Sequence, residues 1–252
     1  MSADRANLIQ ARDLTIGYGD RVVLDRVNFG VRSGEVFAIL GASGSGKSTL
    51  LKHLIGLYEP IQGEILISGE NLARAEGADR LRILRKFGVL FQGGALFGSL
   101  TTVENVRLPL DEFTDLSDTA KDFIALSKLR LVGLESAATR MPADLSGGMQ
   151  KRAGIARAIV LDPCILFLDE PSAGLDPLTS AGLDALIREL AHGLGMTFVM
   201  VTHELPSIFS VADRVIVLDP KNRSIAAEGV PADLRENASL PWVRQFLNRK
   251  PA

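Results

Sequence analysis

The sequence predicts an α/β fold with a mostly parallel sheet, and three features lead to this prediction. A glycine-rich loop at 41–49 stands between an apolar run and a helix-like stretch. In the last third of the chain, short apolar runs alternate with helical segments, which is typical of parallel strands with helices on both faces. The chain has 252 residues, 46% of them hydrophobic, enough for one large domain or a domain with an insert.

The amino-terminal part predicts an antiparallel β portion. Apolar runs indicate short strands at 8–11, 22–24, 27–29 and 63–69. Turn residues such as Gly17, Gly19 and Gly34 lie between strands of this region. From about Asp79 the spacing of apolar residues becomes helical.

The middle of the chain, from about 92 to 157, reads mainly as helix and predicts a helical subdomain inserted between two α/β portions. Thr101 and Glu104 match a capping box, which marks the start of a helix. A second helix is expected at 119–132 from its apolar spacing. Beyond the insert we expect strands at 165–168, 197–201 and 215–218, and helices at 177–190 and 205–209.

A phosphate-binding pattern, G-x-x-x-x-G-K-[ST], occupies Gly41-Ala42-Ser43-Gly44-Ser45-Gly46-Lys47-Ser48-Thr49. It follows the apolar run 36–40 and precedes a helix-like stretch, the context in which this motif works. The glycines allow backbone N–H groups to turn toward a phosphate, and the helix start adds its positive dipole end. Lys47 can reach the β- and γ-phosphates, and the Ser48 hydroxyl can ligate Mg²⁺. The pattern therefore predicts binding of a nucleoside triphosphate with Mg²⁺.

Two carboxylates, Asp169 and Glu170, follow the apolar run 165–168. The end of such a strand lies at the edge of a parallel sheet where ligands bind. Asp169 suits the Mg²⁺ shell, through water, and Glu170 suits polarising the water that attacks the γ-phosphate.

A second anion-binding element reads Leu145-Ser146-Gly147-Gly148-Met149-Gln150 and precedes a helix. A serine and two glycines at a helix start offer free N–H groups and a hydroxyl. Two phosphate-binding elements in one chain make sense if two chains pair head to tail, each helix capping the nucleotide of the other chain.

This last run resembles the signature of ATP-binding cassette (ABC) ATPases, which are P-loop NTPases with a RecA-like core, and further elements agree in order. Gln92 looks like the Q-loop glutamine, which touches Mg²⁺ and senses the membrane partner. Residues 172–176, ending in Asp176, look like the D-loop of the dimer seam. His203 looks like the switch histidine that bonds the γ-phosphate, and Tyr18 like the aromatic that stacks on adenine.

The resemblance implies a single ABC ATPase domain over 1–230, with a short tail at 231–252, that binds ATP and Mg²⁺. Its catalytic residues would be Glu170, His203 and Lys47. Its metal site would be Ser48, Gln92 and Asp169. Tyr18, the loop 41–49, Ser146, Gly147, Gly148, Gln150 and Asp176 would complete the nucleotide site. Because the signature must come from a second chain, the resemblance implies a dimer of two copies.

Three classes of ABC protein compete for this chain. Soluble translation members usually have two cassettes and DNA-maintenance members a long coiled coil, whereas this chain has one cassette and no such insert. A non-catalytic scaffold would tolerate the loss of Lys47 or Glu170, and both are present. These comparisons favour the energy subunit of a transporter.

Within transporters, the segment 92–100 resembles the Mla-type phospholipid-transport ATPases, as do the shorter runs 141–146 and 243–247. That group pairs the ATPase with integral-membrane permease subunits, usually a small STAS-type regulator and a periplasmic MCE-domain lipid-binding protein. The resemblance implies a location on the cytoplasmic face of the inner membrane, held through the permease. The alternative cargo is a small polar solute, because amino-acid importers carry nearly the same cassette.

Composition also bears on which classes of partner this chain is expected to bind. The net charge of −2 gives no reason to expect a nucleic-acid partner. No apolar run reaches the roughly 20 residues of a membrane span, so another chain would have to supply one. The single cysteine, Cys164, suits a reducing compartment, and we expect it to pack in a buried strand.

The segment 240–247 has an apolar helical face that either packs on its own domain or docks on a partner.

Overall fold

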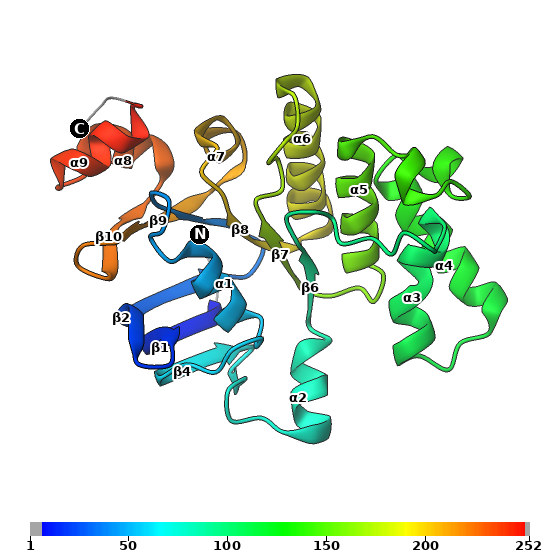
Figure 1. The fold of residues 1–252 in the computed structure, drawn as a ribbon, viewed down its shortest axis with the longest axis horizontal. Helices are drawn as coiled ribbons and strands as arrows, with labels where there is room; N and C mark the ends of the chain where they lie inside the picture. Colours follow the sequence, from blue (N-terminus) through cyan, green and yellow to red (C-terminus); the bar gives the residue numbers. More distant parts are fainter. Residues whose placement is uncertain (1–6, 250–252) are drawn as a thin grey trace, which may run out of the picture.

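A computed structural model describes residues 7–249 of the chain (Figure 1). The strands are β1 (Asn7–Tyr18), β2 (Arg21–Arg32), β3 (Val36–Leu40), β4 (Gln62–Ile67), β5 (Glu70–Asn71), β6 (Phe87–Leu90), β7 (Ile165–Asp169), β8 (Thr197–Val201), β9 (Arg214–Asp219) and β10 (Ser224–Gly229). The helices are α1 (Lys47–Leu54), α2 (Gly77–Leu84), α3 (Thr102–Phe113), α4 (Asp118–Leu131), α5 (Gly147–Ala158), α6 (Pro177–Leu194), α7 (Leu205–Val211), α8 (Pro231–Asn237) and α9 (Pro241–Leu247). Parallel and antiparallel sheets are both present, which confirms the predicted α/β class.

The main sheet has six strands in the order β10-β9-β3-β8-β7-β6. All neighbouring pairs from β9 to β6 are parallel, and β10 adds an antiparallel edge to β9. Strands β3, β7 and β8 are almost wholly apolar because residues on both of their faces are buried. This sheet is the frame on which the candidate site is built.

A second sheet, in the order β2-β1-β4-β5, is entirely antiparallel and confirms the β portion expected at the amino-terminal end. The prediction of two short strands at 22–24 and 27–29 was wrong, because β2 is one strand from Arg21 to Arg32. The polar residues between the two apolar runs include Arg26, which lies in the left-handed region at φ 46°. The register between β1 and β2 shifts in this part, so the strand continues through an irregularity rather than ending at a turn.

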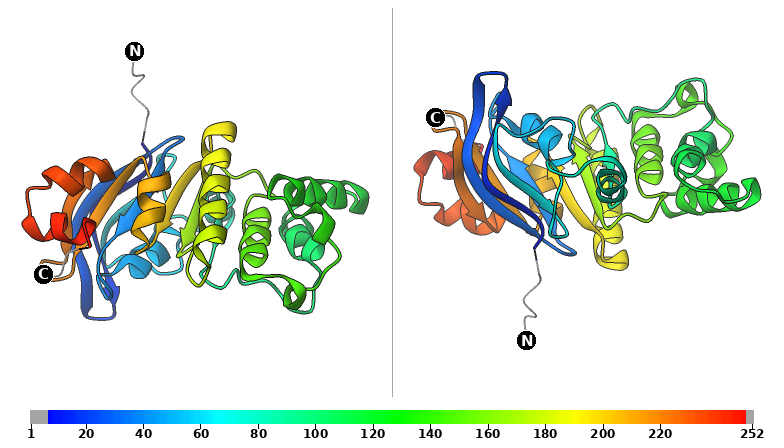
Figure 2. Two further views of the ribbon diagram at one scale, coloured as in Figure 1. Left: turned by 90° about the horizontal axis from the view of Figure 1, so that it is seen from above. Right: turned by 90° about the horizontal axis from the view of Figure 1, so that it is seen from below.

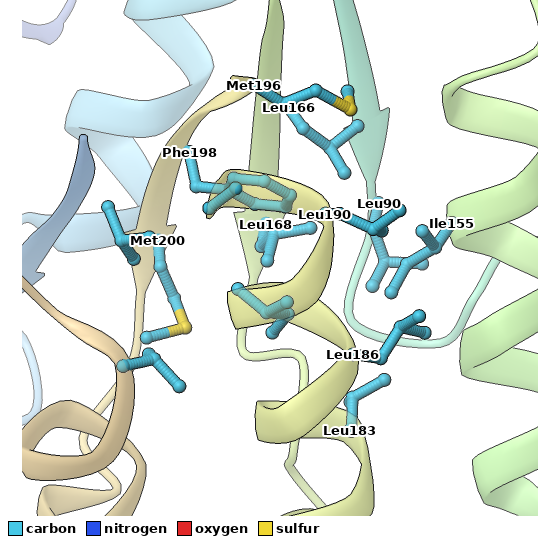
Figure 3. Packing of buried hydrophobic residues seen from close by; sticks show 14 of the residues in the cluster. Leu90, Ile155, Leu166, Leu168, Leu183, Leu186, Leu190, Met196, Phe198 and Met200 are labelled. Carbon is cyan, nitrogen blue, oxygen red and sulfur yellow. The ribbon is translucent and has the colours of Figure 1, made fainter. Parts of the chain in front are cut away.

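The apolar core forms two layers, one on each face of the main sheet. Alternate residues of β7 enter different layers: Leu166 and Leu168 join one, and Phe167 the other. Figure 3 shows the first layer, in which leucines of α6, among them Leu186 and Leu190, face the strands. The second layer lies between the main sheet, α1 and the antiparallel sheet. Both layers hold the strands that carry the site residues.

Helices α3, α4 and α5 form a helical lobe at one end of the molecule, as expected for the insert (Figure 2). The predicted capping box is present, because Thr101 and Glu104 each bond to the backbone of the other. Within the lobe, Arg107 of α3 connects to α4 through ion pairs with Asp118 and Asp122. The lobe is therefore held both by its apolar core and by a charged network across its helices.

Helices α8 and α9 lie at the opposite end of the molecule from the helical lobe (Figure 2). Val243 and Leu247 of α9 are at most 2% exposed and belong to the first core layer, and Ala238 between the helices is 3% exposed. Two roles were open for the apolar face of the segment 240–247, and the structure shows that this face packs on its own domain.

Cys164 does not pack in a buried strand as predicted. It precedes β7 by one residue and is exposed, and its Sγ lies 3.3 Å from the carbonyl oxygen of Lys86. Among residues 7–249, no helix has the length and apolar character that crossing a bilayer requires.

Asp184 of α6 is a buried carboxyl group in a small polar cluster. It is 5% exposed, and its Oδ1 has no hydrogen-bond partner among the described residues. Ser207 Oγ lies 3.3 Å from Ser172 Oγ in the segment after β7. Burial raises the pKa of Asp184 above the ordinary aspartate value, against the opposing effects of Ser207 and Arg188. The folded chain thus holds this proton more tightly than the unfolded chain, so stability falls as the pH rises between the two pKa values.

Asp184→Asn is expected to raise the free energy of unfolding at pH 8 by about 1 kcal/mol, because a neutral group replaces a buried, incompletely paired carboxylate. The gain should disappear as the pH falls below the ordinary aspartate value of 3.8, where both states bind the proton. Urea unfolding of both proteins across this range measures the effect, with exposed Asp115→Asn as the control. A loss of stability of equal size at every pH would contradict the prediction.

Candidate functional site

Four neighbouring strands bring the predicted site residues to one edge of the main sheet. Strands β6, β7, β8 and β3 lie side by side and run parallel. Parallel strands present their carboxyl ends at the same edge, so the loops after these strands carry Gln92, Glu170, His203 and Lys47 to one side.

The phosphate loop joins β3 to α1 and depends on its glycines. Gly46 has φ 97°, and a Cβ there would lie 2.6 Å from Val23 Cγ1, so a side chain at this position would collide. Lys47 opens α1 and is 9% exposed. Its Nζ donates to the carbonyl oxygens of Gly41 at 2.9 Å and Ala42 at 3.1 Å. The ammonium group is therefore held against the loop that the motif assigns to phosphate.

Of the residues predicted to hold Mg²⁺, Asp169 and Ser48 offer oxygen ligands of the kind that this ion prefers. Asp169 Oδ1 is buried and has no hydrogen-bond partner among the described residues, which leaves an oxygen acceptor for a cation or its water. Ser48 stands on the first turn of α1 beside Lys47. Within the described part of the chain no cluster of three His, Cys, Asp or Glu could hold a metal by itself. Mg²⁺ usually takes one or two carboxylates and completes its shell with phosphate oxygens and water, so the free Oδ1 of Asp169 suits this ion.

Burial and neighbouring charges together shift the pKa values of Lys47 and Asp169. Burial lowers the pKa of Lys47, and the negative charges of Glu170 and Asp169 oppose this shift. Burial raises the pKa of Asp169, Glu170 raises it further, and Lys52, Lys151 and Lys47 oppose the rise. Lysines and carboxylates are thus close enough to influence each other's protonation, an arrangement that suits a phosphate and a cation.

Glu170 is held in a fixed position at the end of β7. Its φ of 47° lies in the left-handed region, which is rare for a residue with a side chain and marks local backbone strain. Its main-chain N–H donates to the carbonyl of Val201 at 2.8 Å. Its carboxylate accepts from Nδ1 of His203 at 2.9 Å and from the His203 main-chain N–H at 3.4 Å. The fold therefore brings together the carboxylate and the histidine that the sequence placed 33 positions apart.

Tyr18 borders a hollow of 270 Å³ beside the phosphate loop. The hollow is lined by Tyr18, Arg21, Val23, Gly44, Gly46, Lys47, Ser48 and Thr49. Tyr18 is 43% exposed, its ring meets Tyr58 edge-on at 5.3 Å, and its hydroxyl lies 3.2 Å from Thr49 Oγ1. An exposed aromatic ring beside a phosphate loop is the geometry that stacking on a base requires.

The signature run has no part in this hollow. Ser146 caps α5, with Oγ accepting from the main chain of Met149 at 3.3 Å, and Gly148 packs closely against Thr179 of α6. The side-chain amide of Gln150 donates to the carbonyl groups of Pro142 and Leu145, in the segment before α5. Residues 145–150 contribute nothing to the lining of the hollow, and α5 lies in the helical lobe (Figure 1).

Asp176 of the predicted D-loop is a helix cap in this chain. Its Oδ1 accepts from the main-chain N–H groups of Leu178 and Thr179, and its Oδ2 from the Thr179 hydroxyl at 2.5 Å. Contact of Asp176, Ser146, Gly147, Gly148 and Gln150 with nucleotide therefore stays a prediction that needs a second chain.

Three further residues lie at the site although the sequence motifs did not predict them. Arg21 and Val23 line the hollow from β2, and no motif marks them. Lys151 of α5 is 5% exposed and donates to the carbonyl oxygens of Gln92 and Glu170, the latter at 3.4 Å. Its only sequence signal is its place one residue after the signature run.

Comparison with known proteins agrees with this geometry. The family model described as ABC transporter matches residues 24–173. The intermembrane phospholipid transport system ATP-binding protein MlaF of Haemophilus influenzae is 41% identical over 241 residues, covering 96% of this chain and 90% of the relative. The MlaF of Escherichia coli K12 is 41% identical and covers 98% of this chain and 91% of its own. The probable ribonucleotide transport ATP-binding protein mkl of Mycobacterium leprae is 40% identical over 95% of this chain and 68% of its own.

Solved structures match as well. The dimeric ATP-binding cassette MJ0796 in a post-hydrolysis state with ADP and Pi has a TM-score of 0.79 and 32% identity, covering 88% of this chain and 98% of its own. The cbiO1 protein of Clostridium perfringens, part of an ABC transporter complex, has a TM-score of 0.84 and 28% identity, with 96% of each chain covered. The chain therefore belongs to the ABC transporter family and is one of its ATPases.

Proposed function

We propose that this chain powers phospholipid transport between membranes as the ATP-hydrolysing subunit of an Mla-type ABC transporter, which maintains the lipid asymmetry of an outer membrane. The observation that carries the proposal is the 41% identity to MlaF proteins, which spans 96% of this chain and 90% of one relative. The assembly would contain two copies of this chain, permease subunits, a STAS-type regulator and an MCE-domain lipid-binding protein. It would place the chain on the cytoplasmic face of the inner membrane, held through the permease.

The reaction is attack of water on the γ-phosphate of ATP, and this chain's residues supply position and charge. Lys47 and the loop amides would bind the phosphates, and Ser48, Asp169 and Gln92 would hold Mg²⁺, which neutralises phosphate charge when bound. Glu170 would orient the water and accept its proton. His203, held by its bond to Glu170, would bond the γ-phosphate. Ser146 and Gly148 of the second copy would close the site.

An apolar groove of 480 Å³ next to the start of the loop that follows β6 and contains Gln92 supports the proposal that a membrane protein docks on this chain. The groove is lined by Leu81, Leu84, Arg85, Phe87, Gly88, Val89, Phe91, Ala95, Phe97, Leu108, Pro109, Phe113, Arg157, Ala158, Leu161 and Pro163. Phe97 is 52% exposed and lies in the segment 92–100 that resembles Mla-type ATPases, and Phe91, which is 38% exposed, directly precedes that segment. Arg85 and Arg157 are the charged residues of the lining, and their guanidinium groups donate to carbonyl groups of this chain. The groove suits the apolar face of a short permease helix.

Phe97→Asp is expected to reduce recovery of the permease with this chain at least about tenfold, because it puts a charge into the apolar groove. The main-chain bonds of Phe97 to Asn105 do not depend on its ring, so the ATPase rate of the isolated chain should change less than about twofold. Phe123→Asp is the matched control, since Phe123 is 75% exposed on α4 and does not line the groove. Unchanged recovery of permease with Phe97→Asp would contradict docking in the groove.

Purification from native membranes tests the cargo. The tagged chain is extracted in mild detergent, and the proteins and lipids that accompany it are identified by mass spectrometry. A permease with an MCE-domain protein and enriched phospholipid would support lipid transport. A permease with a soluble solute-binding protein, without enriched lipid, would support the alternative of a small-solute importer. Recovery without any membrane protein would overturn both and favour a soluble ABC ATPase.

A further inference from the structure

Lys151 is a buried lysine whose partners are two backbone carbonyl groups. Its Nζ donates to the carbonyl oxygen of Gln92 and, at 3.4 Å, to that of Glu170. These carbonyls belong to loops that follow neighbouring strands, β6 and β7. Burial lowers the pKa of Lys151, and the charges of Asp169 and Glu170 oppose this shift. A lysine without a carboxylate bonded to it is costly to bury, so its position calls for a purpose other than an ion pair.

The loop that follows β6, residues 91–101, is called the Gln92 loop here. Three residues on one face of α5 contact it. Lys151 bonds to Gln92, Gly154 lies so close that a Cβ there would be 3.3 Å from the Gly94 carbonyl, and Arg157 donates to the carbonyls of Gly94 and Ala95. The positions 151, 154 and 157 are three residues apart and therefore share one face of a helix. The Gln92 loop and α5 are thus joined along the length of the helix.

Lys151 extends this connection to Glu170. Arg157 donates to carbonyl groups of the Gln92 loop, whereas the ammonium group of Lys151 also reaches the main chain of Glu170, the residue assigned to water activation. Glu170 is in a strained conformation that its surroundings must impose. A bond to its carbonyl group is one of those constraints, together with the bond from its N–H to Val201.

We propose that Lys151 is a positioning residue of the ATPase site. It ties the carbonyl of Gln92 to that of Glu170 and so keeps the Gln92 loop and the water-activating carboxylate in one relative position. This inference rests on the proposed role of Glu170. Lys151 sits one turn into the helix that begins with the signature run. A shift of α5 or of the Gln92 loop would therefore reach the backbone of Glu170 through a single side chain.

The test compares Lys151→Met, Lys151→Arg and Lys121→Met in the full chain purified with its membrane partner. Lys121 is the matched control, because it is a buried lysine of the helical lobe, 9% exposed, that pairs with Asp111. ATP turnover is measured over a range of Mg-ATP, and thermal unfolding is followed in parallel. Misplacing a catalytic group by about 1 Å can cost on the order of 10²-fold in rate, so Lys151→Met is expected to lower kcat by roughly 10- to 100-fold. The KM for ATP should change less than about threefold, since Lys151 does not line the hollow beside the phosphate loop.

Lys151→Arg keeps a cation that can donate to two carbonyl groups and is expected to restore most of the turnover. A normal kcat in Lys151→Met, or an equal fall in Lys121→Met that follows its loss of stability, would overturn the proposal. If Lys151→Met does not fold, Lys151→Gln is measured instead, because its amide is too short to span both carbonyls, and normal turnover would again overturn the proposal. Glu170→Gln is measured in the same assay. Normal turnover in Glu170→Gln would reject the role of Glu170 in water activation, whatever the result for the Lys151 variants.

Discussion

Glu170→Gln is expected to lower ATP turnover by roughly 10²–10⁴-fold, the range that general base catalysis contributes. The variant keeps the size of the side chain, and its amide oxygen can still accept the bond from His203 Nδ1, which lies 2.9 Å from Oε1. It loses the capacity to take a proton from water. ATP binding should persist, because Lys47 and the phosphate loop are untouched. A closed dimer should therefore accumulate with ATP, since the hydrolysis that reopens it no longer occurs.

Three measurements check this result: steady-state phosphate release, binding of a fluorescent ATP analogue, and the size of the protein in solution with Mg-ATP. Glu189→Gln is the control, since Glu189 is an exposed residue of α6. It makes the same chemical change away from the site and should leave all three measurements near their wild-type values. Turnover within about threefold of wild type in Glu170→Gln would remove Glu170 from the role of base.

Lys47→Ala is expected to abolish both hydrolysis and tight ATP binding. Truncating one partner of a buried charge pair costs about 2–5 kcal/mol, which corresponds to a weakening of ATP affinity by roughly 30- to 4,000-fold. The loop itself should remain folded, because its glycines and the buried face of α1 define its course. Without tight binding, ATP should no longer produce a dimer, which separates this variant from Glu170→Gln.

The affinity for ATP is measured by calorimetry, and the rate by phosphate release at saturating Mg-ATP. Exposed Lys221→Ala provides the control for the loss of one positive charge. Affinity within about threefold of wild type would show that the ammonium group does not bind phosphate, despite its place in the loop.

The sequence predicted the fold class and most of the elements, because their signals are local. The capping box at Thr101 and Glu104 and the apolar strand before Asp169 each depend on a few adjacent residues, and both are present in the structure. The errors arose where neighbours in space decide the outcome. The strand β2 continues past polar residues because β1 pairs with it along its length, and Cys164 is exposed because β7 begins one residue later.

The sequence by itself determined the chemistry of the site, since a phosphate loop, an Asp-Glu pair and a signature run are short patterns with their own mechanism. Only the tertiary structure decided which of them meet. The strand order β3-β8-β7-β6 places His203 against Glu170, and the Gln92 loop beside the loop that carries Glu170, although they are far apart in the chain. It also keeps Ser146 in the helical lobe and buries Lys151 between two loops. Contacts of this kind join residues of distant segments through packing, and no spacing along one strand or helix encodes them.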